Sequence, residues 1–228
     1  TQVQILPSLY QLQRLGVVGD LRVCDAKPRF LKALAENESL RAAFPGQSFR
    51  PYPDPESVDP DGFFPRAFKA AFEEAPRGSV AVIAVPDQLH YPILMEALKN
   101  DLHVCIVKPL VLKHAQAEEV AALAFEKGLV VGVEYHKRFD HRALMARRIY
   151  RSGRFGEFRL AQAQMIEPFY YHHSNFQNWC TVENSDMFTY VGCHYVDQVA
   201  FITGLRPVSV SVYGIVEDYP NGNQGYLW

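Results

Sequence analysis

The chain has 228 residues, 48% of them hydrophobic, which suffices for one large domain or two modest ones. Its 23 basic and 25 acidic residues are interspersed, with a formal net charge of -2, and this argues against nucleic acid or a membrane surface as a partner. No apolar run reaches the roughly eighteen residues that a membrane span needs. The four cysteines lack C-x-x-C spacing, so we expect buried, reduced thiols in a cytoplasmic protein and no metal site.

Helical and strand patterns alternate along the first 140 residues. In chain order they predict a helix at 6–16, a strand at 21–24, a helix at 28–44, a strand at 49–52, a helix at 66–75, a strand at 80–85, a helix at 89–100, a strand at 104–107, a helix at 113–127 and a strand at 129–133. The last three strands are continuous apolar runs, as in strands buried on both faces. We therefore predict an α/β domain over residues 1–140 with a parallel, doubly wound sheet.

The pattern changes after a helix predicted at 140–151. It indicates a long strand at 157–166, a polar aromatic segment at 170–179, a helix at 186–203 and an alternating strand at 208–216. This predicts a second, α+β domain over residues 141–228. Because another strand begins near the last residues and two strands rarely form a stable sheet, we expect the chain to be cut at both ends.

Lys108 is the first candidate functional residue. It ends the 104–107 strand and precedes Pro109. Ligands of open α/β sheets bind outside the carboxyl ends of the strands, where an ammonium group stabilises a developing alkoxide or binds a substrate hydroxyl. The alternative is an ordinary solvated charge at a strand end.

The helix at 186–203 carries a second set of candidates. Asp186, Tyr190, His194 and Asp197 are spaced by four, four and three residues, which places them on one stripe of a helix. A histidine flanked by carboxylates suits proton transfer, because a carboxylate holds the imidazole and stabilises its charged form. The alternative is a polar helix face in contact with water.

Two residues in the first domain are candidates for cofactor binding. Asp25 ends the 21–24 strand, where an acidic residue binds the ribose hydroxyls of a dinucleotide, although capping the next helix explains it equally well. Lys27 is placed to pair with a 2'-phosphate, which keeps NADP open beside NAD. The glycine-rich loop expected about twenty residues earlier would precede the chain.

Further candidates follow the later strands and the helix at 140–151. Pro86 and His90 either line the cofactor or cap a helix, and His136 follows the 129–133 strand at the same sheet edge. Arg138 either faces a substrate or ties the two domains together. Tyr170 opens an aromatic segment whose hydroxyl, amide and ring groups suit a sugar, although core packing explains the rings as well.

Four motifs occur together in order. They are Val85-Pro86-Asp87-Gln88-Leu89-His90, which looks like T-P-N-x-x-H, Val107-Lys108-Pro109, like E-K-P, Arg138-Phe139, like R-F, and Gly192-Cys193-His194-Tyr195-Val196-Asp197, like G-x-H-x-x-D. Together they resemble the Gfo/Idh/MocA family of NAD(P)-dependent oxidoreductases. The resemblance implies a Rossmann domain followed by an α+β domain with a large, mostly antiparallel open sheet, here incomplete, and a homo-oligomer when full length.

The resemblance also implies roles for the candidate residues. Lys108 and His194 would flank the reacting carbon of a sugar, sugar acid or cyclic polyol, with Asp197 also at the substrate and hydride passing to or from NAD or NADP. His194 would exchange the hydroxyl proton while Lys108 stabilises the oxygen. Tyr190 stands where an aspartate often precedes the histidine, and Asp186 partly substitutes for that carboxylate.

Two further implications complete the comparison with the family. The segments 175–180 and 213–216 look like a branch often labelled uronate or galacturonate reductases, in which Arg138 would meet a substrate carboxylate. Val107 replaces the glutamate of E-K-P, and this change favours the alternative of a non-catalytic regulator that senses a dinucleotide and a sugar. The presence of both Lys108 and His194 favours the enzyme.

Overall fold

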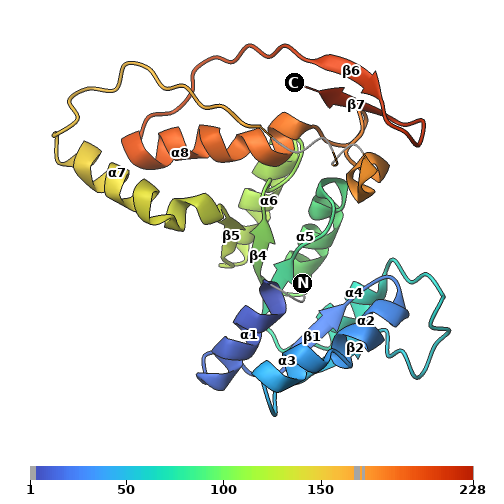
Figure 1. The fold of residues 1–228 in the computed structure, drawn as a ribbon. Helices are drawn as coiled ribbons and strands as arrows, with labels where there is room; N and C mark the ends of the chain where they lie inside the picture. The colour runs from blue at the N-terminus through green and yellow to red at the C-terminus, as the bar shows by residue number, and fades with distance from the viewer. Residues whose placement is uncertain (1–3, 167–169, 171–172, 228) are drawn as a thin grey trace. The chain divides into compact units, whose positions relative to one another are not determined.

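The computed structural model describes residues 4–166, 170 and 173–227. The chain divides into two compact units, Thr1–Arg77 and Gly78–Trp228 (Figure 1). Both contain parallel strands connected by helices, so the predicted α/β class is confirmed.

The first unit is a small α/β layer. Its elements are α1 (Ile5–Arg14), β1 (Leu21–Cys24), α2 (Pro28–Ala35), α3 (Glu38–Ala43), β2 (Phe49–Tyr52) and α4 (Ala67–Glu73). Strands β1 and β2 pair in parallel, with Leu21 opposite Phe49. The helix predicted over 28–44 is instead two helices, because α2 ends at Ala35 and the Asn37 side chain caps a new helix, α3, by accepting a hydrogen bond from the Leu40 N–H.

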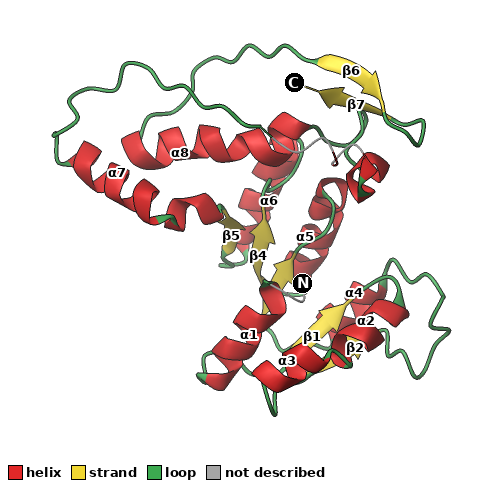
Figure 2. Cartoon of the chain, in the orientation of Figure 1, coloured by secondary structure: helices red, strands yellow, loops and turns green. Residues whose placement is uncertain are grey.

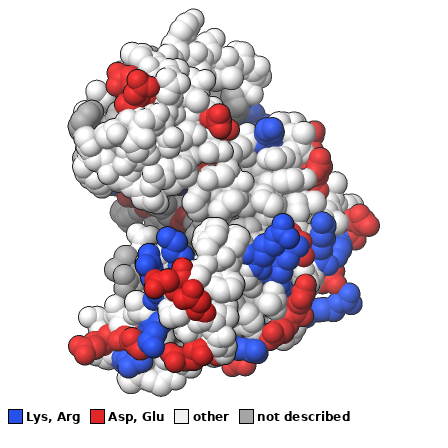
Figure 3. Space-filling model, turned by 90° about the vertical axis from the view of Figure 1, so that its right-hand side faces the viewer, with Lys and Arg blue, Asp and Glu red and all other residues white. Residues whose placement is uncertain are grey.

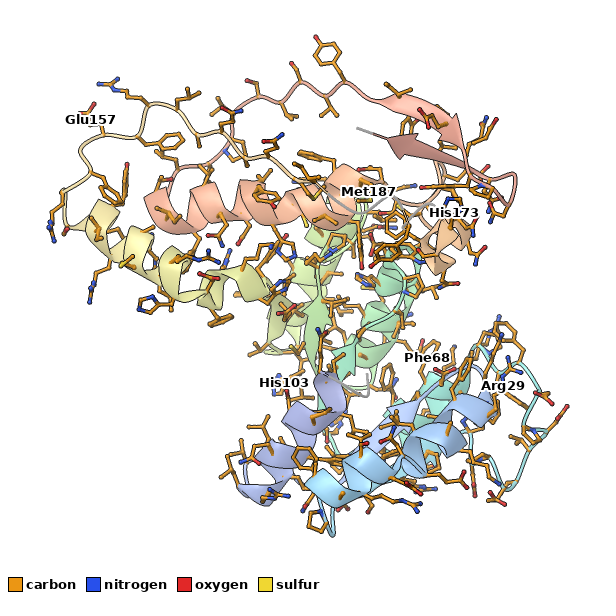
Figure 4. All side chains as sticks on the ribbon, viewed as in Figure 1. Arg29, Phe68, His103, Glu157, His173 and Met187 are labelled. Atoms are coloured by element: carbon orange, nitrogen blue, oxygen red, sulfur yellow. The ribbon has the colours of Figure 1, made fainter. Side chains whose placement is uncertain are left out.

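The second unit begins with three strand-helix repeats. They are formed by β3 (Val80–Ile83), the 3-10 turn η1 (Asp87–Leu89), α5 (His90–Lys99), β4 (His103–Val107), α6 (His114–Glu126), β5 (Val131–Glu134) and the 3-10 turn η2 (His136–Phe139). The strands form a parallel sheet in the order β3-β4-β5. Helix α5 packs on β3 and β4, and Leu94, Leu98 and Ile106 are fully buried. His103, labelled in Figure 4, begins β4 at the opposite end from Lys108.

The expectation that these strands are buried on both faces is wrong. Burial alternates along β3, where Val80 and Val82 expose 58% and 40% of their surface while Ala81 and Ile83 are buried. The apolar runs predicted the strands correctly. A continuous run, however, does not reveal how many faces the neighbouring elements cover.

In the next part of the second unit, helices alternate with long loops (Figure 2). They are α7 (His141–Arg151), the 3-10 turn η4 (Asn175–Asn178), the π-helix η5 (Phe188–Gly192) and α8 (Cys193–Thr203). Helices α7 and α8 pack against each other, and Gly204 ends α8 with a left-handed φ of 81°. Strands β6 (Ile215–Asp218) and β7 (Gln224–Leu227) then form an antiparallel hairpin.

Two predicted strands in this region are wrong. Residues 157–166 are irregular, and the strand predicted at 208–216 starts only at Ile215. Val208 is fully exposed and Leu160 is 87% exposed. Alternation marks a face that needs covering, but a strand also needs a hydrogen-bonding neighbour, and within the described residues neither 157–166 nor 208–214 pairs with a strand.

The surface agrees with the balanced composition. On the face drawn in Figure 3, basic and acidic side chains lie interspersed. Within the described ranges, no helix is long and apolar enough to cross a membrane, and no group of three potential ligands is arranged to hold a metal ion. All four cysteines are free, but only Cys180 is buried and Cys24 is exposed, so the expectation of four buried thiols is wrong.

Candidate active site

The carboxyl ends of the three parallel strands of the second unit carry most of the candidate residues. Asp87 follows β3, Lys108 follows β4, and residues 135–138 follow β5. Helix α8 contacts η2, so His194 and Asp197 come to the same edge. This is the position where open α/β sheets bind ligands.

Lys108 is engaged by the protein. Its ammonium nitrogen donates a hydrogen bond to the Tyr190 carbonyl oxygen and lies 3.6 Å from the centroid of the Tyr190 ring, a cation–π contact. Burial lowers the pKa of Lys108, while Cys193 and Asp87 act in the opposite direction. A freely solvated charge, the alternative left open by the sequence, does not describe this lysine.

Tyr190 belongs to an aromatic cluster. Its ring lies 5.2 Å from both Phe176 and Trp179, and those two rings are 4.9 Å apart. Phe176 is 6% exposed, so the core-packing alternative fits these two members of the aromatic segment. Tyr170 is 59% exposed, and its neighbours 167–169 and 171–172 lie outside the described residues.

His194 is deeply buried at this edge, with 2% of its surface exposed. Its ring makes edge contacts with Tyr135, at 5.9 Å, and with His136, at 4.6 Å. Its buried Nδ1 atom has no hydrogen-bond partner among the described residues. Burial, and next the positive charge of Lys108, lower the pKa of His194 to about 4, so its imidazole is neutral near pH 7.

The expected carboxylate support for His194 differs from the structure. Asp186 caps the helix start, accepting from the Thr189 N–H at 2.7 Å and from the Thr189 hydroxyl at 2.8 Å. Asp197 is bound to Arg138. The reason is local: the π-helix Phe188–Gly192 interrupts the α-helical spacing on which the predicted stripe of four residues depends.

The π-helix places Gly192 against an aromatic ring. A Cβ atom on Gly192 would approach the Phe188 ring to 2.8 Å, closer than side-chain atoms pack. Gly192 thus lets the Phe188 ring lie across the turn that precedes His194.

Arg138 ties η2 to α8. Its Nε lies 2.8 Å from Asp197 Oδ2 and its Nη2 lies 2.5 Å from Oδ1, a forked pair in which the Asp197 side chain is 8% exposed. The hydrogen bond to Asp197 raises the pKa of Arg138. The geometry fits the tying role that the sequence left as one alternative, and it leaves fewer N–H groups for a substrate.

His90 is fully buried. Its Nδ1 lies 2.6 Å from the Pro109 carbonyl oxygen, and its Nε2 lies 3.0 Å from that of Val85. Its two ring nitrogens therefore face carbonyl oxygens from the chain after β3 and the chain after β4. This fits a structural role rather than the predicted contact with a cofactor.

Two other predicted cofactor residues remain accessible. Pro86 is half-buried just before η1, and the His136 side chain is 59% exposed with its Nδ1 3.6 Å from Glu134. Both stay predicted cofactor contacts at the sheet edge.

Asp25 and Lys27 belong to the first unit. Asp25 Oδ1 accepts a hydrogen bond from the Lys27 N–H at 2.8 Å, which closes a turn before α2, but Lys27 is the N-cap of α2 and no side chain caps that helix, so the capping alternative is not observed. Asp25 is exposed, and the Lys27 ammonium lies 5.9 Å from the Phe30 ring centroid. Their contacts with a cofactor stay predictions.

The sequence analysis missed one pair at the edge. The Ser185 hydroxyl donates to Asp87 Oδ2 at 2.6 Å, and the two residues are 6% and 3% exposed. Burial raises the pKa of Asp87, and the Ser185 hydrogen bond acts against this. An acidic residue directly after the proline that follows β3 was the available signal for Asp87.

Comparison with family models decides the classification. Residues 33–135 match the model described as "Oxidoreductase family, NAD-binding Rossmann fold", and residues 143–224 match the "GFO/IDH/MocA C-terminal domain". The chain belongs to the Gfo/Idh/MocA oxidoreductase family. The recognition made from the four motifs is thus confirmed, while the exact boundary at residue 140 stays a prediction.

Curated relatives in this family match part of the chain. The oxidoreductase YfiI of Bacillus subtilis is 34% identical over 115 residues, which is 49% of this chain and 29% of YfiI. A UDP-N-acetylglucosamine 3-dehydrogenase of Acidithiobacillus ferrooxidans is 24% identical over 146 residues, 64% of this chain and 42% of that enzyme. The matched part therefore spans less than half the length of either relative.

Solved structures share the fold. A myo-inositol 2-dehydrogenase from Lactobacillus plantarum superposes with a TM-score of 0.69 at 15% identity, covering 96% of this chain and 64% of that one. The WlbA dehydrogenase from Thermus thermophilus, in complex with NAD and UDP-GlcNAcA, gives 0.61 at 20% identity, covering 93% and 62%. At these identities, the similarity establishes the Rossmann-containing fold of the family.

Proposed function

We propose that the protein is an NAD(P)-dependent oxidoreductase that transfers a hydride between nicotinamide and a hydroxyl-bearing carbon of a sugar, sugar acid or cyclic polyol. The observation that carries the proposal is a buried, neutral histidine with an unpaired nitrogen beside an engaged lysine, both at the carboxyl edge of a parallel sheet. Family membership supplies the reaction class.

The residues at this edge fit a nicotinamide cofactor. Strands β3, β4 and β5 are parallel neighbours, so their carboxyl ends lie at one edge of the sheet. Among the described residues, no group hydrogen-bonds to the buried Nδ1 atom of His194. Pro86 and His136 would contact the cofactor there, and Asp25 and Lys27 its ribose and a 2'-phosphate if present. The bound nicotinamide would accept or supply the hydride.

The protein's own groups handle the proton and the charge. A neutral His194 is able to take the hydroxyl proton as the carbon–hydrogen bond breaks, and to return it in the reverse direction. The Lys108 ammonium stabilises the negative charge that develops on the substrate oxygen. Burial, and next the Lys108 ammonium, lower the pKa of His194 and leave it unprotonated at neutral pH, so the two groups enter the reaction in complementary states.

The substrate contacts are a further part of the proposal. Lys108 and His194 bind the reacting hydroxyl, and the exposed Tyr170 offers a hydroxyl to a sugar. Asp197 and Arg138 would bind the substrate with the groups that their mutual pair leaves accessible. A uronate carboxylate would have to compete with Asp197 for Arg138.

The test uses protein expressed from its complete reading frame. NADH and NADPH absorbance would be followed with a panel of uronic acids, aldoses and inositols. We expect turnover with one substrate class, reduced about 10²-fold or more in His194→Gln and in Lys108→Met. His114→Gln is the matched control, since the His114 side chain is 86% exposed on α6 and pairs with Glu118.

The second candidate is a regulator that binds a dinucleotide and a sugar without turnover. The specific observation in its favour is that neither Asp186 nor Asp197 supports the imidazole of His194. Calorimetric binding of NADH together with a sugar, and no turnover across the panel, would replace the enzyme by the regulator.

A further inference from the structure

Two side chains from neighbouring strand ends hold the same helical segment. Ile83 in β3 stands opposite Ile106 in β4, and such strands lie about 4.8 Å apart. Beyond this pair, Asp87 accepts from the Ser185 hydroxyl and Lys108 donates to the Tyr190 carbonyl. The two contact points lie five residues apart, where the chain enters the helix that carries His194. Met187, labelled in Figure 4, lies between them.

The hydrogen bond from Ser185 alone does not offset the free-energy cost of burying the Asp87 carboxylate. The residue is 3% exposed, and one hydroxyl does not offset the cost of burying a carboxylate. Against burial, the Ser185 hydrogen bond lowers the pKa of Asp87 most, and the positive charges of His90 and Lys108 lower it next. A cationic partner is thus part of what keeps this carboxylate ionised.

Lys108 has the complementary requirement. Burial disfavours its ammonium form, and Val107 before it supplies no carboxylate. Glu134 at the end of β5 also acts on it, but that side chain is 40% exposed and partly screened by water. Asp87 is the more buried of these two carboxylates.

We propose that Asp87 is the buried counter-charge of Lys108 and that, through Ser185, it positions the helix with His194 against the strand ends. Asp87 is a positioning residue, since its carboxylate binds the Ser185 hydroxyl of the protein. Its consequence for turnover rests on the proposed function, whereas its effect on Lys108 does not.

Other titratable groups also face Lys108. They are the thiols of Cys180 and Cys193, the carboxylate of Glu134 and the imidazole of His194. Burial raises the pKa of both thiols, so they are neutral near pH 7 and carry no counter-charge there. The carboxylates therefore decide the charge state of Lys108 in the neutral range.

The test is the titration of Lys108 in the 228-residue chain by NMR with lysine labelled at Cε. Its signal is assigned by its loss in Lys108→Met. Asp87→Asn keeps an oxygen that can accept from Ser185 but removes the charge, so we expect the pKa of Lys108 to fall by about one unit or more. Glu134→Gln should produce a smaller fall. Glu118→Gln, at an exposed site on α6, is the control. If the pKa of Lys108 shifts no more in Asp87→Asn than in Glu118→Gln, Asp87 is not the counter-charge of Lys108.

Ser185→Ala tests the positioning half independently. The carboxylate remains, so the pKa of Lys108 should change little, while the amides of residues 190–197 should exchange with deuterium about tenfold faster as the loss of one hydrogen bond frees the helix start. Unchanged exchange would overturn the positioning role. This variant also keeps the proposal testable should Asp87→Asn fail to fold.

Kinetics separate this inference from the proposed function. In an active enzyme, Asp87→Asn should move the alkaline limb of the kcat/KM profile to lower pH by the same amount as the NMR titration, and an unmoved limb would overturn the role of Asp87 in turnover. Absence of turnover in the parent protein would refute the proposed function and leave the NMR result for Asp87 standing.

Discussion

Replacing Arg138 by methionine should destabilise the second unit more than replacing its partner, Asp197, by asparagine. The two side chains form a forked pair between η2 and α8, but their burial is unequal: Asp197 is 8% exposed and Arg138 is 42% exposed. Losing the arginine leaves a buried carboxylate without a partner. Losing the carboxylate leaves a guanidinium that water still reaches.

The size of the effect follows from this geometry. Removing one partner of a fully buried pair costs about 3–5 kcal/mol, and an exposed pair contributes about 0.2–1 kcal/mol. A pair with one buried and one half-exposed member lies between these limits. We therefore expect about 2–3 kcal/mol for Arg138→Met, about 1 kcal/mol for Asp197→Asn and a coupling energy near 1.5 kcal/mol in the double variant.

Urea unfolding followed by tryptophan fluorescence suits this measurement. Both tryptophans, Trp179 and Trp228, belong to the second unit. Methionine retains part of the packing that Arg138 makes over the Phe201 ring. Arg142→Met is the matched control, because Arg142 pairs with Asp140 but is 87% exposed, so little change is expected.

Two results would refute this reasoning. Equal losses for Arg138→Met and Asp197→Asn would show that unequal burial does not govern the pair. A loss for Arg138→Met no greater than that for Arg142→Met would show that water screens the pair completely.

Three further predictions concern stability. The pKa of His194 is about 4 in the folded protein and 6.5 in the unfolded chain, so the unfolded chain binds the proton first as the pH falls. The contribution of His194 to the free energy of unfolding should therefore be complete above pH 6.5 and decrease toward pH 4. In urea titrations over this pH range, His194→Gln should lack this contribution, whereas the exposed control His114→Gln should keep it. Leu98→Ala should cost about 2–5 kcal/mol in urea unfolding, because Leu98 is fully buried on α5, and a loss no greater than that of the 42%-exposed Leu89→Ala would contradict the packing of α5. Asn37→Ala should cost about 1 kcal/mol, measured by hydrogen exchange at the α3 amides, and unchanged exchange there would rule out the cap.

The sequence allowed the strand ends to be predicted because their signals are local. Continuous apolar runs marked β3, β4 and β5, and parallel pairing then required Lys108 to emerge at the same edge as the residues after β5. His194 followed from helical spacing and from the family motifs. These inferences need only nearby residues and the handedness of strand-helix connections.

The partners of the site residues could not be predicted in the same way. The Asp87–Ser185 hydrogen bond joins residues 98 positions apart. The spacing of Asp186 and His194 assumed an α-helix, and the π-helix between them left Asp186 bound to Thr189 instead. Partner choice depends on how elements pack, and apolar periodicity carries no information about it.

The π-helix before α8 makes the length of this segment as important as its composition. Phe188–Gly192 holds one more residue per turn than an α-helix would. Winding the same residues as a regular α-helix would turn every later side chain of α8 by about 100° about the helix axis. His194 and Asp197 would then leave Tyr135 and Arg138 together. Homologues that keep these contacts should therefore either retain the π-helix or lack one residue between Ser185 and Cys193, because removing the extra residue leaves the later side chains facing the same way.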